Sequence, residues 1–377
     1  MSGNKKQAVL VSCTDHYKNR MYIIDDCLKR EGFETIYLTS DFNHYEKKPF
    51  TCETEGAIQL HVRQYKKNIS PDRILSHRDF ARSVYEFLEN LPHEPELLVI
   101  EIPPNFLAKY MAKYKRKHPN VKLVFDIFDL WPETFPFGKL KKLLSIPFKI
   151  WGGLRDKNLK YADVVITECD MYKEKLDIMD NPKVKTVYLA GKRADDMELS
   201  SDLSEEKTKL CYLGAINNII DIPAIEGFVT ELVKLKPCKV NVIGSGERTE
   251  ELLEALRMAG AEVEYHGAVF DKEKKREILA KCHFGLNIMK PSVCVGLTMK
   301  SVDYFSHDLP IINTIPADTR ALVETERVGF NLDADTAKRV AQMSVAEAID
   351  LRKNVRDMFD KTFDLSVISQ KFTNILK

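Results

Sequence analysis

Short apolar runs alternate with amphipathic stretches along nearly the whole chain, and this alternation restricts the possible folds more than any other feature. In the first half the apolar runs are 7–12 (QAVLVS), 35–38, 97–102 (LLVIEI), 121–125 (VKLVF), 164–167 (VVIT) and 184–188. Because most of these runs lack polar residues at alternate positions, they predict parallel strands covered by helices on both faces. Helices are expected at 21–31, 106–118, 140–160 and 171–178, with the third broken near Pro147 and at Gly152-Gly153.

The second half repeats the same pattern after a polar, aperiodic segment, 191–207, which reads as a linker. Its expected strands are 210–213, 239–243, 262–265, 284–288, 311–313 and 330–332. Its expected helices are 223–234, 247–259, 272–281, 299–306, 319–324, 345–359 and 365–376. The sequence therefore predicts an α/β protein with two Rossmann-like domains, 1–195 and 196–360, facing across a cleft. The C-terminal helix, 361–377, is expected to pack back on them.

Length and charge agree with two globular domains that do not bind nucleic acid. The 377 residues carry a formal net charge of +1, and 44% of them are hydrophobic. The charge is uneven, since residues 1–195 carry a net +6 and the remainder a net −5. Such a division suggests that the two halves face different partners.

Cysteine usage and hydropathy indicate a protein of the cytoplasm. The eight cysteines are scattered without a CxxC pair, so neither a zinc site nor a thioredoxin-like site is expected. The N-terminus has no apolar core of a signal peptide, and no run of about 18 apolar residues occurs.

Three glycine-containing turns follow strands in the second half, at Leu213-Gly214, at 243–247 (IGSGE) and at 295–300 (VGLTMK). Glycine lets a backbone approach a ligand closely, and free amides at the start of a helix favour phosphate. The third turn opens a helix that carries Lys300 and Asp303. A cation near phosphate and a carboxylate near ribose hydroxyls are what a nucleotide requires.

At this level of detail the second half resembles the donor domain of retaining GT-B glycosyltransferases of family GT4. The resemblance covers most of residues 209–332 and rests on YLGAI, VNVIGSGE, YHGAV, AKCHFGLNIMKPS and, most specifically, VGLTMKSVDYFSHDLPIIN. In the first half, FDLWPE (128–133) and ADVVIT (162–167) are similar to a cleft-facing turn and a strand of the same family.

The resemblance implies a nucleotide-sugar site in the second half, with no cofactor and no metal ion. Backbone amides around Gly296, Leu297 and Thr298 would hold the diphosphate, and Asp303 would take the ribose hydroxyls. The segment at Gly267 would line the base, and Asp129 would face the acceptor or the sugar. The turn residues Gly214, Gly244, Ser245 and Gly246 would lie close to the nucleotide.

Two positions depart from the family pattern. Val295 occupies the place of a glutamate that contacts the donor sugar, and 215–223 (AINNIIDIP) lacks the basic pair that neutralises the leaving diphosphate. Lys300 or Lys290 could substitute for that pair. Loss of one such contact can reduce the rate by about 10²–10³.

Further candidates lie in the first half. Asp15 and His16 follow the first strand, and His16 joins Asp129 as a candidate catalytic group, while Asp15, Trp131 and Glu133 are candidates for acceptor contacts. Each also has a structural interpretation, as a polar turn or a packing residue. Lysines interleaved with apolar residues at 109–117 and 139–160 fit either a helix on anionic lipid or a solvated helix face.

These features predict a glycosyltransferase that moves a sugar, most simply a hexose, from a nucleoside-diphosphate sugar, with UDP favoured, to a hydroxyl acceptor. The acceptor would be a saccharide or a lipid-linked sugar of cell-surface polysaccharide or glycoconjugate assembly, at the cytoplasmic face of a membrane. A non-catalytic partner of an active transferase and a sugar-nucleotide epimerase remain alternatives.

Overall fold

The computed structural model describes residues 6–14, 18–68, 70–135, 145–193 and 206–377. The chain divides into two compact units. Unit 1 comprises Met1–Tyr188 and Ile368–Lys377, and unit 2 comprises Leu189–Val367. The boundary expected between 195 and 196 falls in the segment 194–205, outside the described residues.

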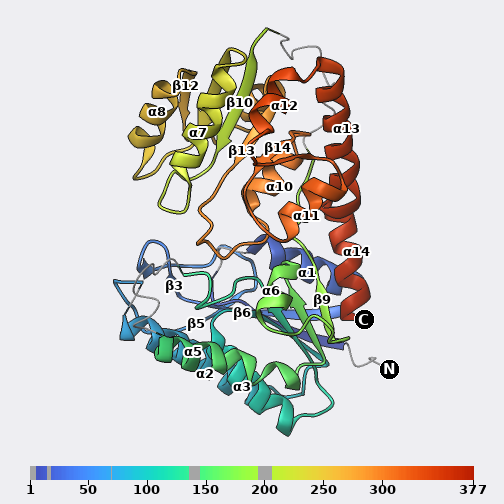
Figure 1. Cartoon of the computed structure of the whole chain (residues 1–377). Helices are drawn as coiled ribbons and strands as arrows, with labels where there is room; N and C mark the ends of the chain where they lie inside the picture. The colour runs from blue at the N-terminus through green and yellow to red at the C-terminus, as the bar shows by residue number, and fades with distance from the viewer. Residues whose placement is uncertain (1–5, 15–17, 69, 136–144, 194–205) are drawn as a thin grey trace. The chain divides into compact units, whose positions relative to one another are not determined.

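Unit 1 is built on a seven-stranded parallel sheet with the order β5-β2-β1-β6-β7-β8-β9 (Figure 1). Its strands are β1 Lys6–Val11, β2 Phe33–Ser40, β5 Ile58–Leu60, β6 Leu97–Ile102, β7 Lys122–Ile127, β8 Val164–Thr167 and β9 Val184–Thr186. A small antiparallel pair, β3 (Phe42–Asn43) and β4 (Lys48–Pro49), lies outside this sheet. Every residue of β6 is buried, as expected for a strand covered on both faces.

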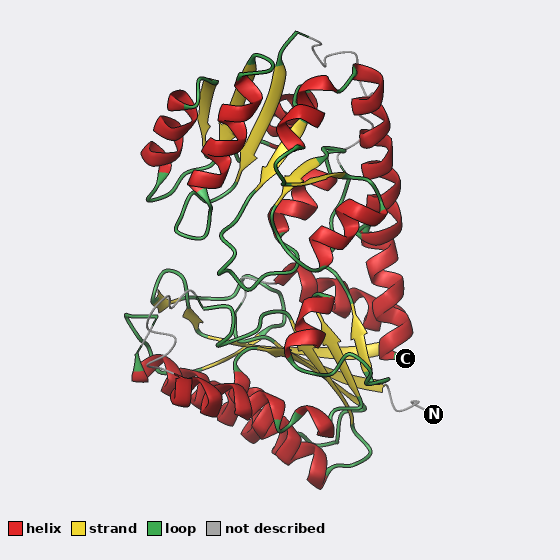
Figure 2. Ribbon diagram, viewed as in Figure 1, coloured by secondary structure: helices red, strands yellow, loops and turns green. Residues whose placement is uncertain are grey.

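Helices cover both faces of this sheet. α2 (Pro71–Glu89), α3 (Asn105–Lys117) and α5 (Ser145–Asp156) lie side by side on one face, as Figures 1 and 2 show. α1 (Lys18–Arg30) and α6 (Asp170–Lys175) pack near β2 and β8, and the short 3-10 helix η2 spans Leu159–Tyr161.

The prediction of a broken helix at 140–160 is wrong for the described part of that segment, because α5 runs through Pro147 and Gly152-Gly153 without interruption. Pro147 lies in the first turn of α5, where its missing amide hydrogen costs no helical hydrogen bond.

α2 was not expected from the sequence. It begins with Ser70 as N-cap, whose hydroxyl accepts from the amide of Arg73 at 3.2 Å, followed by Pro71 at the first helical position. Its buried face repeats Phe80, Val84 and Leu88. The Ser-Pro start and this spacing were therefore available as a helix signal.

Unit 2 has a six-stranded parallel sheet with the order β12-β11-β10-β13-β14-β15. Its strands are β10 Thr208–Leu213, β11 Cys238–Ile243, β12 Glu262–Gly267, β13 Phe284–Asn287, β14 Ile311–Asn313 and β15 Gly329–Asn331. Its helices are α7 Ile222–Val233, α8 Thr249–Met258, α9 Lys272–Ala280, α10 Met299–Phe305, α11 Asp318–Thr325, α12 Thr336–Gln342 and α13 Val345–Thr362. Of the helices that the structure describes in this half, only α12 lacks a counterpart among the expected ones. The predicted class, two parallel-sheet α/β domains, is confirmed.

The last helix, α14 (Leu365–Leu376), carries the chain back to unit 1. Its buried Phe372 lies under Arg20, with the guanidinium carbon 5.0 Å from the ring centroid. Lys122 donates from Nζ to the carbonyls of Ile375 and Leu376, both at 3.0 Å, and so caps the end of the helix. No helix in the described ranges is long and apolar enough to cross a membrane.

Candidate functional site

Both sheets reverse their strand order at one point, between β1 and β6 in unit 1 and between β10 and β13 in unit 2. In open parallel sheets ligands bind beyond the carboxyl ends of the strands at this point, where neighbouring connections leave in opposite directions. A ligand of either unit is therefore expected beyond the strand ends at these two positions.

In unit 2 the turns after β10, β11 and β12 are joined by backbone hydrogen bonds. The Gly214 amide donates to the carbonyl of Ile243 at 2.9 Å, and the Gly244 amide donates to the carbonyl of Gly267 at 2.7 Å. The carbonyl of the exposed Ser245 accepts from the amide of Ile216 at 3.1 Å. The predicted residues of these turns thus form one continuous edge.

Close backbone packing explains two of these glycines. Gly244 has a φ of 135°, and a Cβ there would lie 2.0 Å from the carbonyl oxygen of Gly214. A Cβ at Gly246 would lie 2.2 Å from the carbonyl oxygen of Ile216. The backbone of the first turn, residues 214–216, therefore leaves no room for a side chain at Gly244 or Gly246. A Cβ at Gly267 would meet nothing within 4 Å.

Lys300, on α10, lies against the first glycine turn. Its Cε is 3.3 Å from the position of a Cβ on Gly214, and its Nζ lies 4.2 Å from the ring centroid of Tyr212 and 3.2 Å from the hydroxyl. No carboxylate lies within ion-pair distance of this ammonium in the described part of the chain. Burial lowers the pKa of Lys300 to about 7. An anion bound at this turn would stabilise the charged form of Lys300, which burial disfavours.

Asp303 lies one turn further along α10 and is already paired. Both its oxygens accept from Nζ of Lys275, at 2.8 and 2.9 Å, and Nδ1 of His307 lies 3.6 Å from Oδ1. The carboxylate is about one-third exposed, so it is accessible to a ligand hydroxyl.

The loop before α10 holds the remaining predicted residues of this half. Gly296 and Leu297 are buried, Val295 is half-buried, and the carbonyl of Gly296 accepts from both the amide and the hydroxyl of Thr319, at 2.9 and 2.7 Å. Thr298 is the N-cap of α10 and accepts from the amide of Ser301 at 3.0 Å. The loop is thus held firmly at both of its ends.

Unit 2 also has a cavity of about 430 Å³, which lies beside β11, β12 and α9 and away from the glycine turns. None of the predicted nucleotide-sugar residues lines it, and its walls carry the ion pair of Lys239 with Glu264, at 2.6 Å.

In unit 1 a cavity of about 540 Å³ lies at the switch point, which we call the switch-point cavity. Its lining comes from the segments that follow β1, β6 and β7, from α2 and from residues 44–68 before α2: Cys13, Thr14, His44, Tyr45, Lys47, Asn68, Arg73, His77, Pro103, Pro104, Phe128, Asp129, Trp131, Thr134 and Phe135.

Two of the predicted first-half residues, Asp129 and Trp131, line this cavity. Asp129 accepts from Trp131 Nε1 at 2.5 Å, from the Leu130 amide at 2.7 Å and from the Thr134 hydroxyl at 2.8 Å. Burial raises the pKa of Asp129 although these hydrogen bonds oppose the shift.

Glu133 is engaged elsewhere, because its carboxylate pairs with the buried Arg155 at 2.9 Å, and it does not line the cavity. Asp15 and His16 lie outside the described residues.

Sequence reasoning missed the polar and aromatic groups that α2 and residues 42–68 bring to the cavity. His77 stacks on Trp131, with ring centroids 5.6 Å apart and planes 19° apart. His44 lies 2.7 Å from the Tyr65 hydroxyl through Nδ1. Burial lowers the pKa of His44 to about 4 and the pKa of His77 well below its ordinary value, so both imidazoles are neutral near pH 7.

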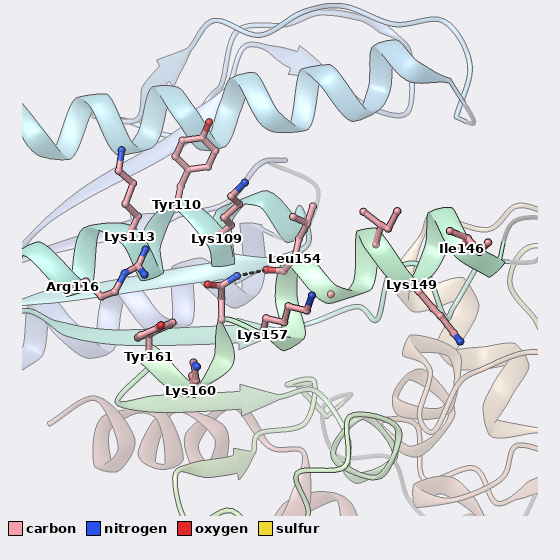
Figure 3. A pocket seen from close by; sticks show the side chains of 13 residues that line it. Lys109, Tyr110, Lys113, Arg116, Ile146, Lys149, Leu154, Lys157, Lys160 and Tyr161 are labelled. Atoms are coloured by element: carbon pink, nitrogen blue, oxygen red, sulfur yellow. Dashed lines mark hydrogen bonds between the residues drawn. The ribbon is translucent and has the colours of Figure 1, made fainter.

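A second feature of unit 1 is a basic groove of about 910 Å³ between α3 and α5 (Figure 3). Among the described residues, six cations and no carboxylate line it: Lys109, Lys113 and Arg116 from α3, Lys149 from α5, Lys157 from the turn after α5, and Lys160 from η2. Ile146 and Ile150 stand beside them and are 70% and 66% exposed. Some of the lysines predicted to contact lipid, at 139–142, lie outside the described residues.

Among the described residues no group of three or more His, Cys, Asp or Glu side chains could hold a metal ion.

Solved structures share this architecture. The chain aligns with the lipopolysaccharide outer core galactosyltransferase WaaB at a TM-score of 0.67 and 11% identity, covering 98% of each chain. It aligns with Anabaena HepE in complex with UDP at a TM-score of 0.64 and 13% identity, covering 98% of this chain and 99% of that one. For S. aureus TarM, solved with UDP, the TM-score is 0.56 at 13% identity. That alignment includes 79% of this chain but only 59% of the TarM chain.

The chain has the GT-B fold. No protein-family model matches its sequence, and no curated protein matches it. At these identities the structural likeness establishes the fold alone.

Proposed function

We propose that this GT-B protein is a glycosyltransferase that binds a nucleoside-diphosphate sugar on unit 2. The observation that carries the proposal is the hydrogen-bonded edge of glycine turns at the switch point, with Lys300 against Gly214 and without a carboxylate partner in the described residues. A cation beside open backbone turns suits a diphosphate. HepE and TarM, which share the fold, were solved with UDP, and this favours UDP as the nucleotide.

The roles of the backbone amides and of Asp303 are carried over from the resemblance to family GT4, and the role of Lys300 is assigned from its position beside the Gly214 turn. Amides of Gly296, Leu297 and Thr298 hold the diphosphate, and Asp303 accepts ribose hydroxyls. Lys300 stabilises the leaving diphosphate in place of the absent basic pair, and no metal ion takes part. The transferred group is a hexose whose anomeric configuration is retained.

Unit 1 holds the hydroxyl acceptor in the switch-point cavity, where Trp131 offers an aromatic face to a sugar ring. Asp129 and His16 are the proposed catalytic groups. The raised pKa of Asp129 suits a carboxyl group that exchanges a proton with the acceptor hydroxyl. The acceptor belongs to polysaccharide or glycoconjugate assembly in the cytoplasm.

Asp303→Ala tests the nucleotide site. We expect UDP binding to weaken by about 1–3 kcal/mol in calorimetry, because the ribose hydroxyls lose their acceptor. Lys275→Met is the matched control, since it removes the present partner of Asp303 and leaves the carboxylate in place. Unchanged affinity of Asp303→Ala for both UDP and GDP would contradict the assignment.

A non-catalytic partner of an active transferase is the second candidate. Val295 and the lack of basic residues in 215–223 favour it, since both remove groups that the family uses for transfer. UDP binding without hydrolysis or transfer of UDP- and GDP-sugars to any of a panel of acceptors would support this role. Conversion of a free sugar nucleotide without acceptor would instead indicate an epimerase.

We also propose that the basic groove of unit 1 faces an anionic membrane surface. Six cations without a carboxylate, beside two exposed isoleucines, combine charge attraction with apolar insertion (Figure 3). Lys109→Glu with Lys113→Glu should reduce flotation with phosphatidylglycerol vesicles at least about tenfold. Lys234→Glu with Lys353→Glu, both more than half exposed on unit 2, makes the same change in net charge and should retain binding. An equal loss of vesicle binding in both double variants would refute the proposal that the basic groove is the membrane-binding surface.

A further inference from the structure

Arg73 in the switch-point cavity is a buried cation inside an aromatic box. Its side chain is 7% exposed. The guanidinium carbon lies 4.4 Å from the ring centroid of Trp131, 5.2 Å from that of Phe135 and 5.9 Å from that of Tyr65. These rings hold the guanidinium in place by cation–π attraction. The first turn of α2 therefore delivers a preorganised charge to the cavity.

The charge of Arg73 lacks a carboxylate partner among the described residues. Nη1 donates to the carbonyl of Asn68 at 3.0 Å, and Nε has no hydrogen-bond partner. The two other buried arginines in the described part of unit 1 are paired: Arg20 with Asp126 at 2.7 Å, and Arg155 with Glu133 at 2.9 Å. A buried charge destabilises the folded state unless it is paired. Arg73, unlike Arg20 and Arg155, would therefore be stabilised by a bound anion.

The one carboxyl group near Arg73 in the cavity lining attracts the guanidinium but forms no ion pair with it in the described part of the chain. Asp129, the one carboxyl group in the cavity lining, has both oxygens engaged by Leu130, Trp131 and Thr134, and burial raises its pKa. The cavity also contains Lys47, and burial lowers the pKa of Arg73 itself. With Arg73 and Lys47 against the single carboxyl group of Asp129, the described lining carries an excess of positive charge.

We propose that the switch-point cavity binds an oxyanion through Arg73, so that the acceptor is a saccharide or other hydroxyl compound bearing a phosphate or carboxylate group. The planar guanidinium fork matches two oxygens of either group, and Trp131 can pack against the adjoining sugar ring. The naming of this ligand as the acceptor rests on the proposed function, whereas the binding of the anion does not.

The test measures binding of glucose 6-phosphate, glucuronic acid and glucose by calorimetry. We expect at least one of the two anions to bind at least about tenfold more tightly than glucose, and the stronger of them identifies phosphate or carboxylate as the group recognised. Arg73→Met should weaken that binding at least about tenfold. Arg78→Met, on an exposed position of the same helix, should leave it unchanged.

A second readout covers the case in which Arg73→Met does not fold. Trp131 and Trp151 are the two tryptophans of the chain, so Trp151→Phe leaves Trp131 as the sole tryptophan, whose emission can be excited apart from that of tyrosine. An anion bound to Arg73 should then change the Trp131 emission with the same affinity that calorimetry gives. Arg73→Lys, which keeps the charge but not the fork, should shift this titration to weaker binding.

The proposal is overturned if neither anion binds more tightly than glucose or if Trp131 emission does not respond. It is also overturned if Arg116→Met, in the basic groove, abolishes binding while Arg73→Met does not. UDP binding by Arg73→Met should match that of the wild type. Absence of UDP binding in the wild type would count against the proposed function and leave the anion result standing.

Discussion

At the scale of single residues, the two candidate sites share one feature, a cation that forms no ion pair with a carboxylate among the described residues. Lys300 packs on Tyr212 and the Gly214 turn, and Arg73 lies among Trp131, Phe135 and Tyr65. A desolvated cation without a partner destabilises the folded state and is stabilised by a bound anion.

The destabilisation caused by the buried charge of Lys300 can be measured from the pH dependence of the free energy of unfolding. Its pKa is about 7 in the folded protein against an ordinary value of 10.5, so between these values the unfolded chain binds more protons than the folded one. The free energy of unfolding should therefore rise with pH from about 7 to about 10.5. Lys300→Met should melt higher than the wild type below pH 7, and the difference should shrink towards pH 10. A difference in melting temperature that stays constant across this range would contradict the shifted pKa.

At the scale of elements, the glycine turns of unit 2 are determined first by strand-to-strand geometry. Gly214 and Gly244 both have positive φ, and the Gly244 amide reaches across to Gly267. The edge that we propose binds the nucleotide thus exists because β10, β11 and β12 end together.

Gly244→Ala should therefore destabilise unit 2 by about 3 kcal/mol or more, because a Cβ would collide with the carbonyl of Gly214 in a backbone conformation that side chains rarely adopt. Gly227→Ala is the control: a Cβ there meets nothing within 4 Å inside α7, and the change should stabilise by about 0.5–1 kcal/mol. Urea unfolding followed by circular dichroism compares the two. A wild-type midpoint for Gly244→Ala would refute the steric argument.

At the scale of the whole molecule, the chain does not finish in the unit where its last strand lies. α13 belongs to unit 2, but α14 returns to unit 1 and buries Ile368 and Phe372 there. The Cys27 thiol donates to the carbonyl of Ser369 at 3.3 Å, which ties α14 to α1. Unit 1 is therefore completed by residues from both ends of the sequence.

Phe372→Ala should accordingly destabilise unit 1 by about 3–5 kcal/mol, because it removes a fully buried ring. Hydrogen exchange should quicken in β1 and β7 and remain unchanged in β10 and β11. Asn374→Ala, at an exposed position of the same helix, should stay within about 0.5 kcal/mol of the wild type. Faster exchange confined to unit 2 would contradict the assignment of α14 to unit 1.

The sequence by itself determined the two parallel sheets and the position of the glycine turns, because strand periodicity and turn glycines are local properties. β6, β8, β14 and α14 have the predicted bounds. It did not reveal α2, although Ser70 and Pro71 mark its start.

Only the tertiary structure decided which charged groups are paired. Glu133 is taken by Arg155 and Asp303 by Lys275, while Arg73 is left with aromatic neighbours from a distant part of the chain. Desolvation and ion pairing depend on which remote segments pack together, and no spacing within one segment encodes that. The chemistry proposed for both units therefore rests on contacts that the strand pattern makes possible but does not specify.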